Sequence, residues 1–297
     1  MNAHAQPDAV TDLAPPEGRY VTTADGTLLA ASWTRPLGPP RGAVLIVPAM
    51  GVPQRYYEAF AAWLGREGFH ALTFDYRGMG ASRRGSLRGF DADIVTWGEQ
   101  DTAAALDELT RVAPGLPITW IGHSLGGQIV PFTPNHGRAA RIVTVAAGSG
   151  YWKRNSPALR RRVWLLWFGV APVATRLAGY FPGRRLGMVG DLPRGVLEQW
   201  RSWCLDERYA VGVGGEPVQA LFDAVTTPIA SISFDDDEMM SEWSIRSLHG
   251  FYRSADVALH RFSPADLGRE RVGHFGFFRR ELEPFWRARV LGELAAR

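Results

Sequence analysis

The chain has 297 residues, of which 46% are apolar and 21% charged; these ordinary globular values exclude disordered and fibrous classes. Its net charge of +3 gives no indication of nucleic-acid binding, and a single cysteine, Cys204, excludes an intrachain disulfide or a cysteine-based metal cluster. The only lysine is Lys153, so a Gly-Lys-Ser/Thr phosphate loop is absent as well.

The N-terminal stretch is polar and lacks the apolar core of a secretory signal, and we expect residues 1–17 to be flexible. The longest apolar stretch, Val163–Ala174, is shorter than the roughly 20 residues that span a bilayer. We therefore expect a cytoplasmic protein without stable membrane insertion. The run Arg160–Arg162 next to apolar residues leaves contact with a membrane surface open.

Two β-like segments, Arg19–Thr23 and Leu28–Thr34, flank a turn signal and predict an antiparallel hairpin. Short, continuous apolar runs then alternate with helical patterns, such as the one over Val95–Val112. Runs of this kind are typical of strands buried on both faces. The alternation predicts an α/β fold, a mostly parallel twisted sheet with helices on both faces. The runs are Ala43–Val47, Ala71–Phe74, Pro117–Ile121, Ile142–Ala146, Ile229–Phe234 and Val257–Phe262.

The alternation stops between about Gly150 and Val225, where the sequence is helix-like and rich in Trp and Arg. An insertion between two strands of one sheet is the simplest explanation. We expect a core formed by residues 18–149 and 226–297, with a helical cap inserted over residues 150–225.

Gly122-His123-Ser124-Leu125-Gly126 matches G-x-S-x-G, with a strand-like run before it and a helix-compatible stretch after it. A serine at the tip of a tight strand-to-helix turn needs very small neighbours. The helix N-terminus then directs free N–H groups at developing negative charge. The motif predicts Ser124 as a nucleophile; a serine that merely caps a helix is the alternative.

A serine nucleophile needs a base and an acid that orients the base. His274 follows the last strand-like run, whereas the other histidines lie in strands, helices, the tail or a turn, or beside Ser124 itself. The run Asp235–Glu238 follows Ile229–Phe234 directly. Ser, Asp and His in this chain order are expected for this arrangement.

These motifs resemble the α/β-hydrolase superfamily from about Ala43 onward, near its serine aminopeptidase and monoacylglycerol-lipase branch. A second motif, Asp75-Tyr76-Arg77-Gly78-Met79-Gly80-Ala81-Ser82, is similar to the D-x-R-G-x-G-x-S loop of that family. The resemblance implies an α/β-hydrolase fold and selects Asp237 as the acid, with Asp236 as its rival. It also places the oxyanion loop at Pro48–Gly51, although the family's His-Gly pair is missing there.

Backbone N–H groups of Met50 and Leu125 would form the oxyanion hole, with Gly51 and Val52 as alternative donors to Met50. The H-G-G-G motif of hormone-sensitive-lipase-like enzymes is absent.

The expected activity is hydrolysis of carboxylic esters of small to medium, apolar substrates through an acyl-enzyme, with neither an organic cofactor nor a metal. An acyltransferase, thioesterase or aminopeptidase would use the same triad, and a non-catalytic ligand-binding protein is a further alternative. Trp152, Trp164, Trp167 and Phe275 are candidate substrate contacts; the tryptophans would otherwise simply pack the cap onto the sheet. Sequence does not determine the oligomeric state.

Overall fold

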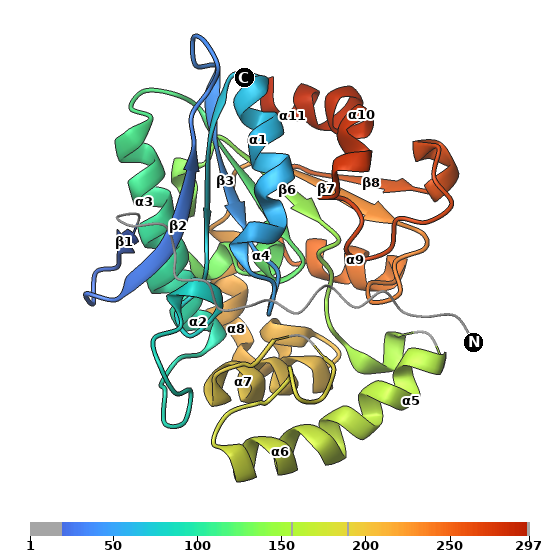
Figure 1. Ribbon diagram of the computed structural model, residues 1–297. Helices are drawn as coiled ribbons and strands as arrows, with labels where there is room; N and C mark the ends of the chain where they lie inside the picture. Colours follow the sequence, from blue (N-terminus) through green and yellow to red (C-terminus); the bar gives the residue numbers. More distant parts are fainter. Residues whose placement is uncertain (1–19, 156, 189, 296–297) are drawn as a thin grey trace.

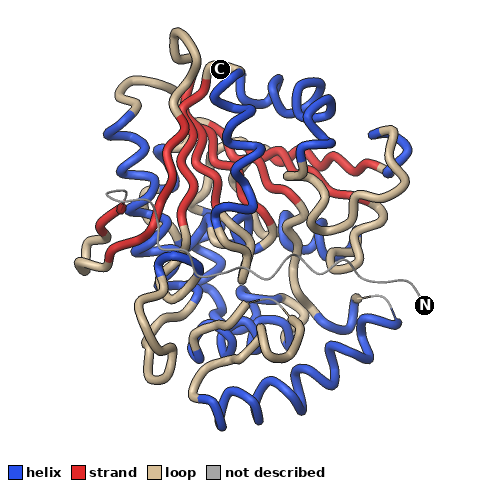
Figure 2. The backbone as a smooth tube through the Cα atoms, viewed as in Figure 1, coloured by secondary structure: helices blue, strands red, loops and turns tan. Residues whose placement is uncertain are grey.

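A computed structural model describes residues 20–155, 157–188 and 190–295, and the predicted flexible segment 1–17 lies outside these residues. An eight-stranded sheet runs through the molecule in the order β1-β2-β4-β3-β5-β6-β7-β8 (Figures 1 and 2). The strands are β1 (Tyr20–Thr22), β2 (Leu28–Thr34), β3 (Gly42–Val47), β4 (Phe69–Phe74), β5 (Ile118–His123), β6 (Arg141–Val145), β7 (Ile229–Phe234) and β8 (Val257–Phe262).

The strands from β4 to β8 are mutually parallel, whereas β2 pairs antiparallel with both β1 and β4. The predicted hairpin and the mostly parallel sheet are therefore confirmed. The central strand β3 is buried at every position. Its side chains alternate between two apolar clusters, with Val44 and Ile46 on one face and Leu45 and Val47 on the other. A strand buried on both faces needs the continuous apolar run seen in the sequence.

Helices cover both faces of the sheet (Figure 1). On one face α1 (Glu58–Arg66) packs with the C-terminal helices α10 (Glu283–Phe285), η10 (Trp286–Val290) and α11 (Leu291–Ala295). On the other face lie α2 (Ile94–Thr96), the π-helical η3 (Trp97–Thr102), α3 (Ala103–Val112), α4 (Leu125–Gln128) and α9 (Glu242–His249). Short 3-10 turns are η1 (Gln54–Tyr57), η2 (Gly80–Ser82), η4 (Val130–Phe132), η5 (His136–Arg138), η6 (Trp152–Arg154), η8 (Pro264–Leu267) and η9 (Arg280–Leu282).

Between β6 and β7 the chain leaves the sheet and forms a helical segment. Its first part is one long, continuous helix made of α5 (Pro157–Leu165), the π-helical η7 (Leu166–Val170) and α6 (Ala171–Ala178). Then follow α7 (Arg194–Leu205) and α8 (Tyr209–Asp223), the latter kinked at Gly215. Figure 1 shows α5, α6 and α7 beyond one end of the parallel strands, with α5 and α6 outermost.

That end of the sheet is where β3, β5, β7 and β8 all terminate, because parallel strands share the edge at which they end. Strand order reverses between β3 and β5, which are neighbours although β4 lies between them in sequence. A crevice opens at such a reversal in an open α/β sheet, and ligands bind there. A ligand site is therefore expected among the loops that follow these four strands.

Among the described residues, no helix has both the length and the apolar character needed to cross a bilayer.

Candidate active site

Ser124 stands at a sharp turn between β5 and α4 with φ of +50° and ψ of −111°, a backbone conformation that a residue with a side chain rarely adopts. Its N–H donates to the carbonyl of Val145 on the neighbouring strand at 2.8 Å. Two N–H groups of the following turn, those of Gly127 and Gln128, donate to the Ser124 carbonyl at 3.0 and 3.3 Å. These bonds hold the strained turn and leave the hydroxyl free to face the crevice.

The glycines of the G-x-S-x-G motif are required by close backbone contacts. A Cβ at Gly122 would lie 2.3 Å from the Gly126 carbonyl oxygen, and one at Gly126 would lie 2.0 Å from the Val47 oxygen. Both distances are far shorter than van der Waals contact. A side chain at either glycine would therefore force the turn away from β3 or β5. The sequence motif is thus explained by the packing of α4 against the end of β3.

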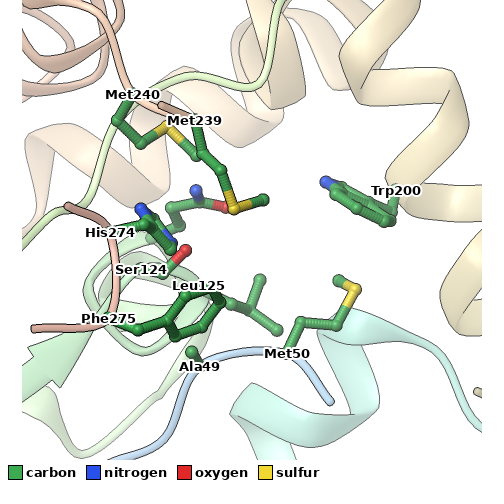
Figure 3. Close-up of a pocket in the computed structure, with 10 residues that line it drawn as sticks. Ala49, Met50, Ser124, Leu125, Trp200, Met239, Met240, His274 and Phe275 are labelled. Atoms are coloured by element: carbon green, nitrogen blue, oxygen red, sulfur yellow. The ribbon is translucent and has the colours of Figure 1, made fainter. Parts of the chain in front are cut away.

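His274 lies in the loop after β8, and its ring reaches the carboxylate that follows β7. The His274 Nδ1 lies 3.0 and 3.1 Å from the two carboxylate oxygens of Asp237, and both side chains are buried. Because a carboxylate only accepts hydrogen bonds, Nδ1 carries the proton and Nε2 keeps a free lone pair. Figure 3 shows the Ser124 hydroxyl directed toward the His274 ring.

The neighbouring carboxylates bind the backbone of the same loop instead of the imidazole. Asp236 accepts the N–H groups of Val272 and Gly273 at 2.8 and 3.0 Å, and Glu238 accepts that of His274 at 3.2 Å. Asp237 itself also accepts the N–H groups of Met239 and Met240, at 2.8 and 2.9 Å. Three consecutive acidic residues therefore fix one loop, and only Asp237 contacts the imidazole.

The loop after β3 brings free backbone donors to the same place. Within the described residues, the N–H groups of Met50, Gly51 and Leu125 donate to no other protein group. In contrast, the Val52 N–H donates to the Ala49 carbonyl at 3.2 Å, so the structure leaves Met50 and Gly51 as the available donors of this loop.

These groups surround a small cavity of about 30 Å³. Apart from Ser124, His274 and Gln128, the described lining residues are apolar. Figure 3 shows Phe275 and Met50 on one side of the Ser124 hydroxyl, the two methionines of the acid loop on the other, and Trp200 of α7 opposite. The lining residues are Ala49, Met50, Ser124, Leu125, Gln128, Trp200, Met239, Met240, His274 and Phe275.

Of the predicted substrate contacts, the structure brings only Phe275 to this cavity. Trp167 is buried and packs edge-on against Trp200, with ring centroids 4.8 Å apart. It therefore lies behind Trp200 and does not line the cavity. Trp152 and Trp164 both contact Phe168 on the far side of the long helix, and Trp164 is 53% exposed. Sequence reasoning did not select Met239, Met240 or Trp200; the signal for the two methionines was their position directly after the acid.

A buried chain of hydrogen bonds joins the oxyanion loop to the base. The Ala49 N–H donates to the Tyr57 hydroxyl at 2.8 Å, and that hydroxyl lies 2.9 Å from His123 Nδ1. The His123 Nε2 lies 3.1 Å from the backbone carbonyl of His274. Burial lowers the pKa of His123 to about 3, so the ring is neutral. The carbonyl can only accept, so Nε2–H donates to it and Nδ1 accepts from Tyr57.

The second motif braces the oxyanion loop without reaching the cavity. The buried Asp75 carboxylate accepts the N–H of Gln54, beyond that loop, at 2.7 Å, and the N–H of Ala81 at 2.8 Å. A Cβ at Gly80 would lie 2.4 Å from this carboxylate, which explains the glycine there. Arg77 pairs with Asp101 and Asp25 at 2.6 Å each and anchors the loop to the β1–β2 turn.

Comparison of sequences matches residues 38–186 to the family described as serine aminopeptidase, S33. Human monoglyceride lipase is 26% identical over 114 residues; this match covers 38% of the chain and only 37% of that lipase.

Among solved structures, a thermostable carboxyl esterase from Bacillus coagulans superposes with a TM-score of 0.60 at 16% identity, covering 93% of this chain and 96% of the esterase. A soluble variant of monoglyceride lipase from Saccharomyces cerevisiae gives a TM-score of 0.56 at 17% identity, covering 86% and 88%. These likenesses confirm the predicted α/β-hydrolase fold.

Proposed function

Because the chain belongs to the serine aminopeptidase S33 family, we propose that it is a serine hydrolase that cleaves carboxylic esters through an acyl-enzyme intermediate. The observation that carries the proposal is the meeting of four strand ends: Ser124 after β5, Asp237 after β7, His274 after β8 and free N–H groups after β3. The helical segment over residues 150–225 is proposed as the cap that closes this site.

In the proposed reaction the Ser124 Oγ attacks the ester carbonyl carbon while His274 Nε2 takes the hydroxyl proton. Asp237 holds the imidazole tautomer and stabilises the positive charge that forms on it. The N–H groups of Met50 and Leu125 receive the oxyanion.

Collapse of the tetrahedral intermediate breaks the bond to the alcohol, which leaves with the proton from His274. A water molecule, deprotonated by His274, then attacks the acyl-enzyme, and Ser124 regains its proton as the acid departs.

The proposed substrates are esters with small to medium apolar acyl groups. The described lining residues contain flexible methionine side chains and aromatic rings, which adapt to apolar groups of varied shape. They include no carboxylate, whereas an aminopeptidase needs an acidic group to bind the substrate's terminal ammonium. This composition favours an ester over an aminoacyl amide. Acyl transfer to an alcohol or thiol would use the same acyl-enzyme and remains the alternative fate of that intermediate.

The test is hydrolysis of p-nitrophenyl esters of increasing acyl length by the wild type and by Ser124→Ala. We expect the substitution to lower kcat by about 10⁶-fold, because nucleophile and base act as one unit. Covalent labelling of the wild type by a fluorophosphonate, absent in Ser124→Ala, locates the reactive group independently of the ester chosen.

Full ester hydrolysis by Ser124→Ala would refute the mechanism. Release of aminoacyl amides faster than esters would instead assign a peptidase.

A further inference from the structure

The charge of the chain is unevenly distributed along the sequence. Residues 151–190 hold eight basic residues and no acidic one. The remainder of the chain then holds 25 basic and 30 acidic residues, a net charge of −5. The small net charge of +3 for the whole chain conceals a strongly cationic segment, and this segment contains the long helix α5–η7–α6, the outermost part of the molecule (Figure 1).

The outward side of this helix is apolar where a surface helix is normally polar. Trp164, Leu165, Phe168, Val173 and Leu177 are 53, 55, 47, 59 and 75% exposed. The opposite side is buried, through Leu166, Trp167, Ala171 and Thr175. A helical stretch that is apolar all round, as Val163–Ala174 is, is ordinarily enclosed on all sides, but this one is open to solvent on one side.

The exposed apolar side chains form one stripe. Trp164, Phe168, Val173 and Leu177 are spaced by four, five and four residues, and the five-residue step spans the π-helical turn η7. A π-helical turn adds a residue to the helix, so it keeps this stripe on one face instead of letting it rotate inward. The helix Pro157–Ala178 is about 33 Å long at 1.5 Å per residue, and the stripe occupies most of it.

Aromatic rings and cations surround one end of the stripe. Trp152 and Trp164 each lie 5.9 Å from Phe168 between ring centroids. Lys153 lies over the Trp152 ring at 5.8 Å, and Arg201 lies over the Phe168 ring at 5.7 Å. Exposed arginines at positions 160, 161, 162 and 176 lie on the same helix. Tryptophan and arginine together are typical of surfaces that meet the boundary between lipid headgroups and acyl chains.

We propose that this outer cap face, formed by Trp152, Trp164, Leu165, Phe168, Val173 and Leu177 with Arg160, Arg161, Arg162 and Arg176, docks the protein on an anionic lipid surface. The binding is peripheral: the apolar stripe enters the acyl boundary while the arginines contact lipid phosphates. It requires no membrane-spanning helix.

Charge selects lipid over the other occupants of an apolar helix face. A symmetric pair of copies would place the arginines of one helix against those of the other, which is unfavourable because the segment supplies no acidic partner. A nucleic acid would satisfy the arginines but would leave the apolar stripe in water. An anionic bilayer satisfies both parts of the face together.

The face is also well placed with respect to the proposed active site. Trp167, on the inner side of the same helix, packs on Trp200, which lines the cavity at Ser124. Docking would thus leave two aromatic rings, Trp167 and Trp200, between the lipid and the cavity. This part of the inference rests on the proposed function, whereas the docking itself does not.

The test is flotation of the full chain with vesicles of phosphatidylcholine alone and with about 30 mol% phosphatidylglycerol. The catalytically inactive Ser124→Ala protein serves as a second sample, so that lipid binding is measured apart from catalysis. We expect binding to the anionic vesicles only, weakened by high salt, and equal for wild type and Ser124→Ala.

Two variants test the arginines and the apolar residues of this face separately. Replacement of Arg160, Arg161, Arg162 and Arg176 by Gln should weaken vesicle binding about 600-fold, since each arginine near an anionic surface contributes roughly fivefold. Replacement of Trp164, Phe168 and Leu177 by Ser should weaken it by a similar factor without changing the charge. The near-UV circular dichroism of both variants establishes that they are folded.

A matched control removes four exposed arginines from elsewhere on the molecule, Arg111, Arg246, Arg253 and Arg287, which are 60 to 72% exposed. This control has the same net charge as the first variant and should bind vesicles nearly as well as the wild type. Equal loss in the control would overturn the assignment to this face. So would a wild type that floats with neither vesicle, or one that self-associates through the stripe in light scattering.

Discussion

Three adjacent carboxylates at the end of β7 have separate tasks that follow from the direction of each side chain. Asp237 points to the imidazole, whereas Asp236 and Glu238 bind backbone N–H groups of the His274 loop. From the sequence, the family resemblance selected Asp237 with Asp236 as its rival, because both follow the same strand and both carry the right chemical group. The path of the loop after β8 distinguishes them, because it places the His274 ring against Asp237 and its backbone against Asp236.

We expect Asp237→Asn to lower kcat by about 10⁴-fold, because an amide favours the wrong imidazole tautomer. Asp236→Asn should lower kcat by only about tenfold, since both backbone N–H groups donate to one carboxylate oxygen, which the amide oxygen can replace. Steady-state hydrolysis of a p-nitrophenyl ester measures both. A larger loss of kcat in Asp236→Asn than in Asp237→Asn would reverse the assignment.

At the scale of elements, the Tyr57–His123 chain couples the loop after β3, strand β5 and the loop after β8. It links the backbone next to Met50, a proposed oxyanion donor, to the backbone of the proposed base. Neither Tyr57 nor His123 lines the cavity, so we interpret them as positioning residues.

Tyr57→Phe removes one hydroxyl and leaves the Ala49 N–H and His123 Nδ1 buried without partners. We expect kcat to fall by about 10- to 100-fold with little change in KM, because small displacements of catalytic groups are costly. His123→Gln, which can accept and donate at similar positions, should retain more activity than His123→Leu.

The control is Tyr252→Phe, since the Tyr252 hydroxyl is also buried but has no partner in the described structure. It should leave kcat unchanged and stability equal or higher. If Tyr57→Phe were as active as Tyr252→Phe, the chain would have no positioning role.

Elements buried on both faces were the most predictable from sequence. The bounds predicted for β7 agree with the structure, because a buried apolar run flanked by polar residues leaves little choice of ends. Those predicted for β8 agree as well, although this edge strand is largely exposed. The α5–η7–α6 helix was less predictable. Over Val163–Ala174 its sequence is apolar on all sides, so the pattern could not show which tryptophans face inward, and Trp152 and Trp164 were expected in the substrate pocket. The π-helical turns could not be predicted either, because the hydrophobic pattern was interpreted with a regular period of 3.6 residues.

At the scale of the whole molecule, buried neutral histidines make stability depend on pH. Burial lowers the pKa of His249 to about 4; its Nδ1 lies 2.7 Å from the Ile245 carbonyl and its Nε2 lies 2.9 Å from the Thr144 hydroxyl. Below its ordinary pKa of 6.5, the unfolded chain binds a proton at this site that the folded chain does not. The stability contributed here is therefore complete above pH 6.5 and decreases as pH falls toward 4.

We expect the difference in unfolding free energy between wild type and His249→Gln to shift by about 2 kcal/mol between roughly pH 7.5 and 5, with the wild type losing more. Comparison with the variant cancels opposing groups such as Asp101, whose pKa burial raises to about 6. Urea unfolding followed by circular dichroism gives both curves. Parallel curves over this range would show that His249 takes up its proton equally in both states.

The small size of the cavity at Ser124 has a kinetic consequence. A space of about 30 Å³ holds one or two water molecules but no acyl chain. An ester that binds at Ser124 therefore has to widen this space, and the Met50, Met239 and Trp200 side chains of its lining are the groups that would move. The measured affinity for any substrate is then the intrinsic affinity reduced by the fraction of molecules that are open. A smaller side chain in place of Trp200 should therefore raise kcat/KM for bulky esters without changing a catalytic group.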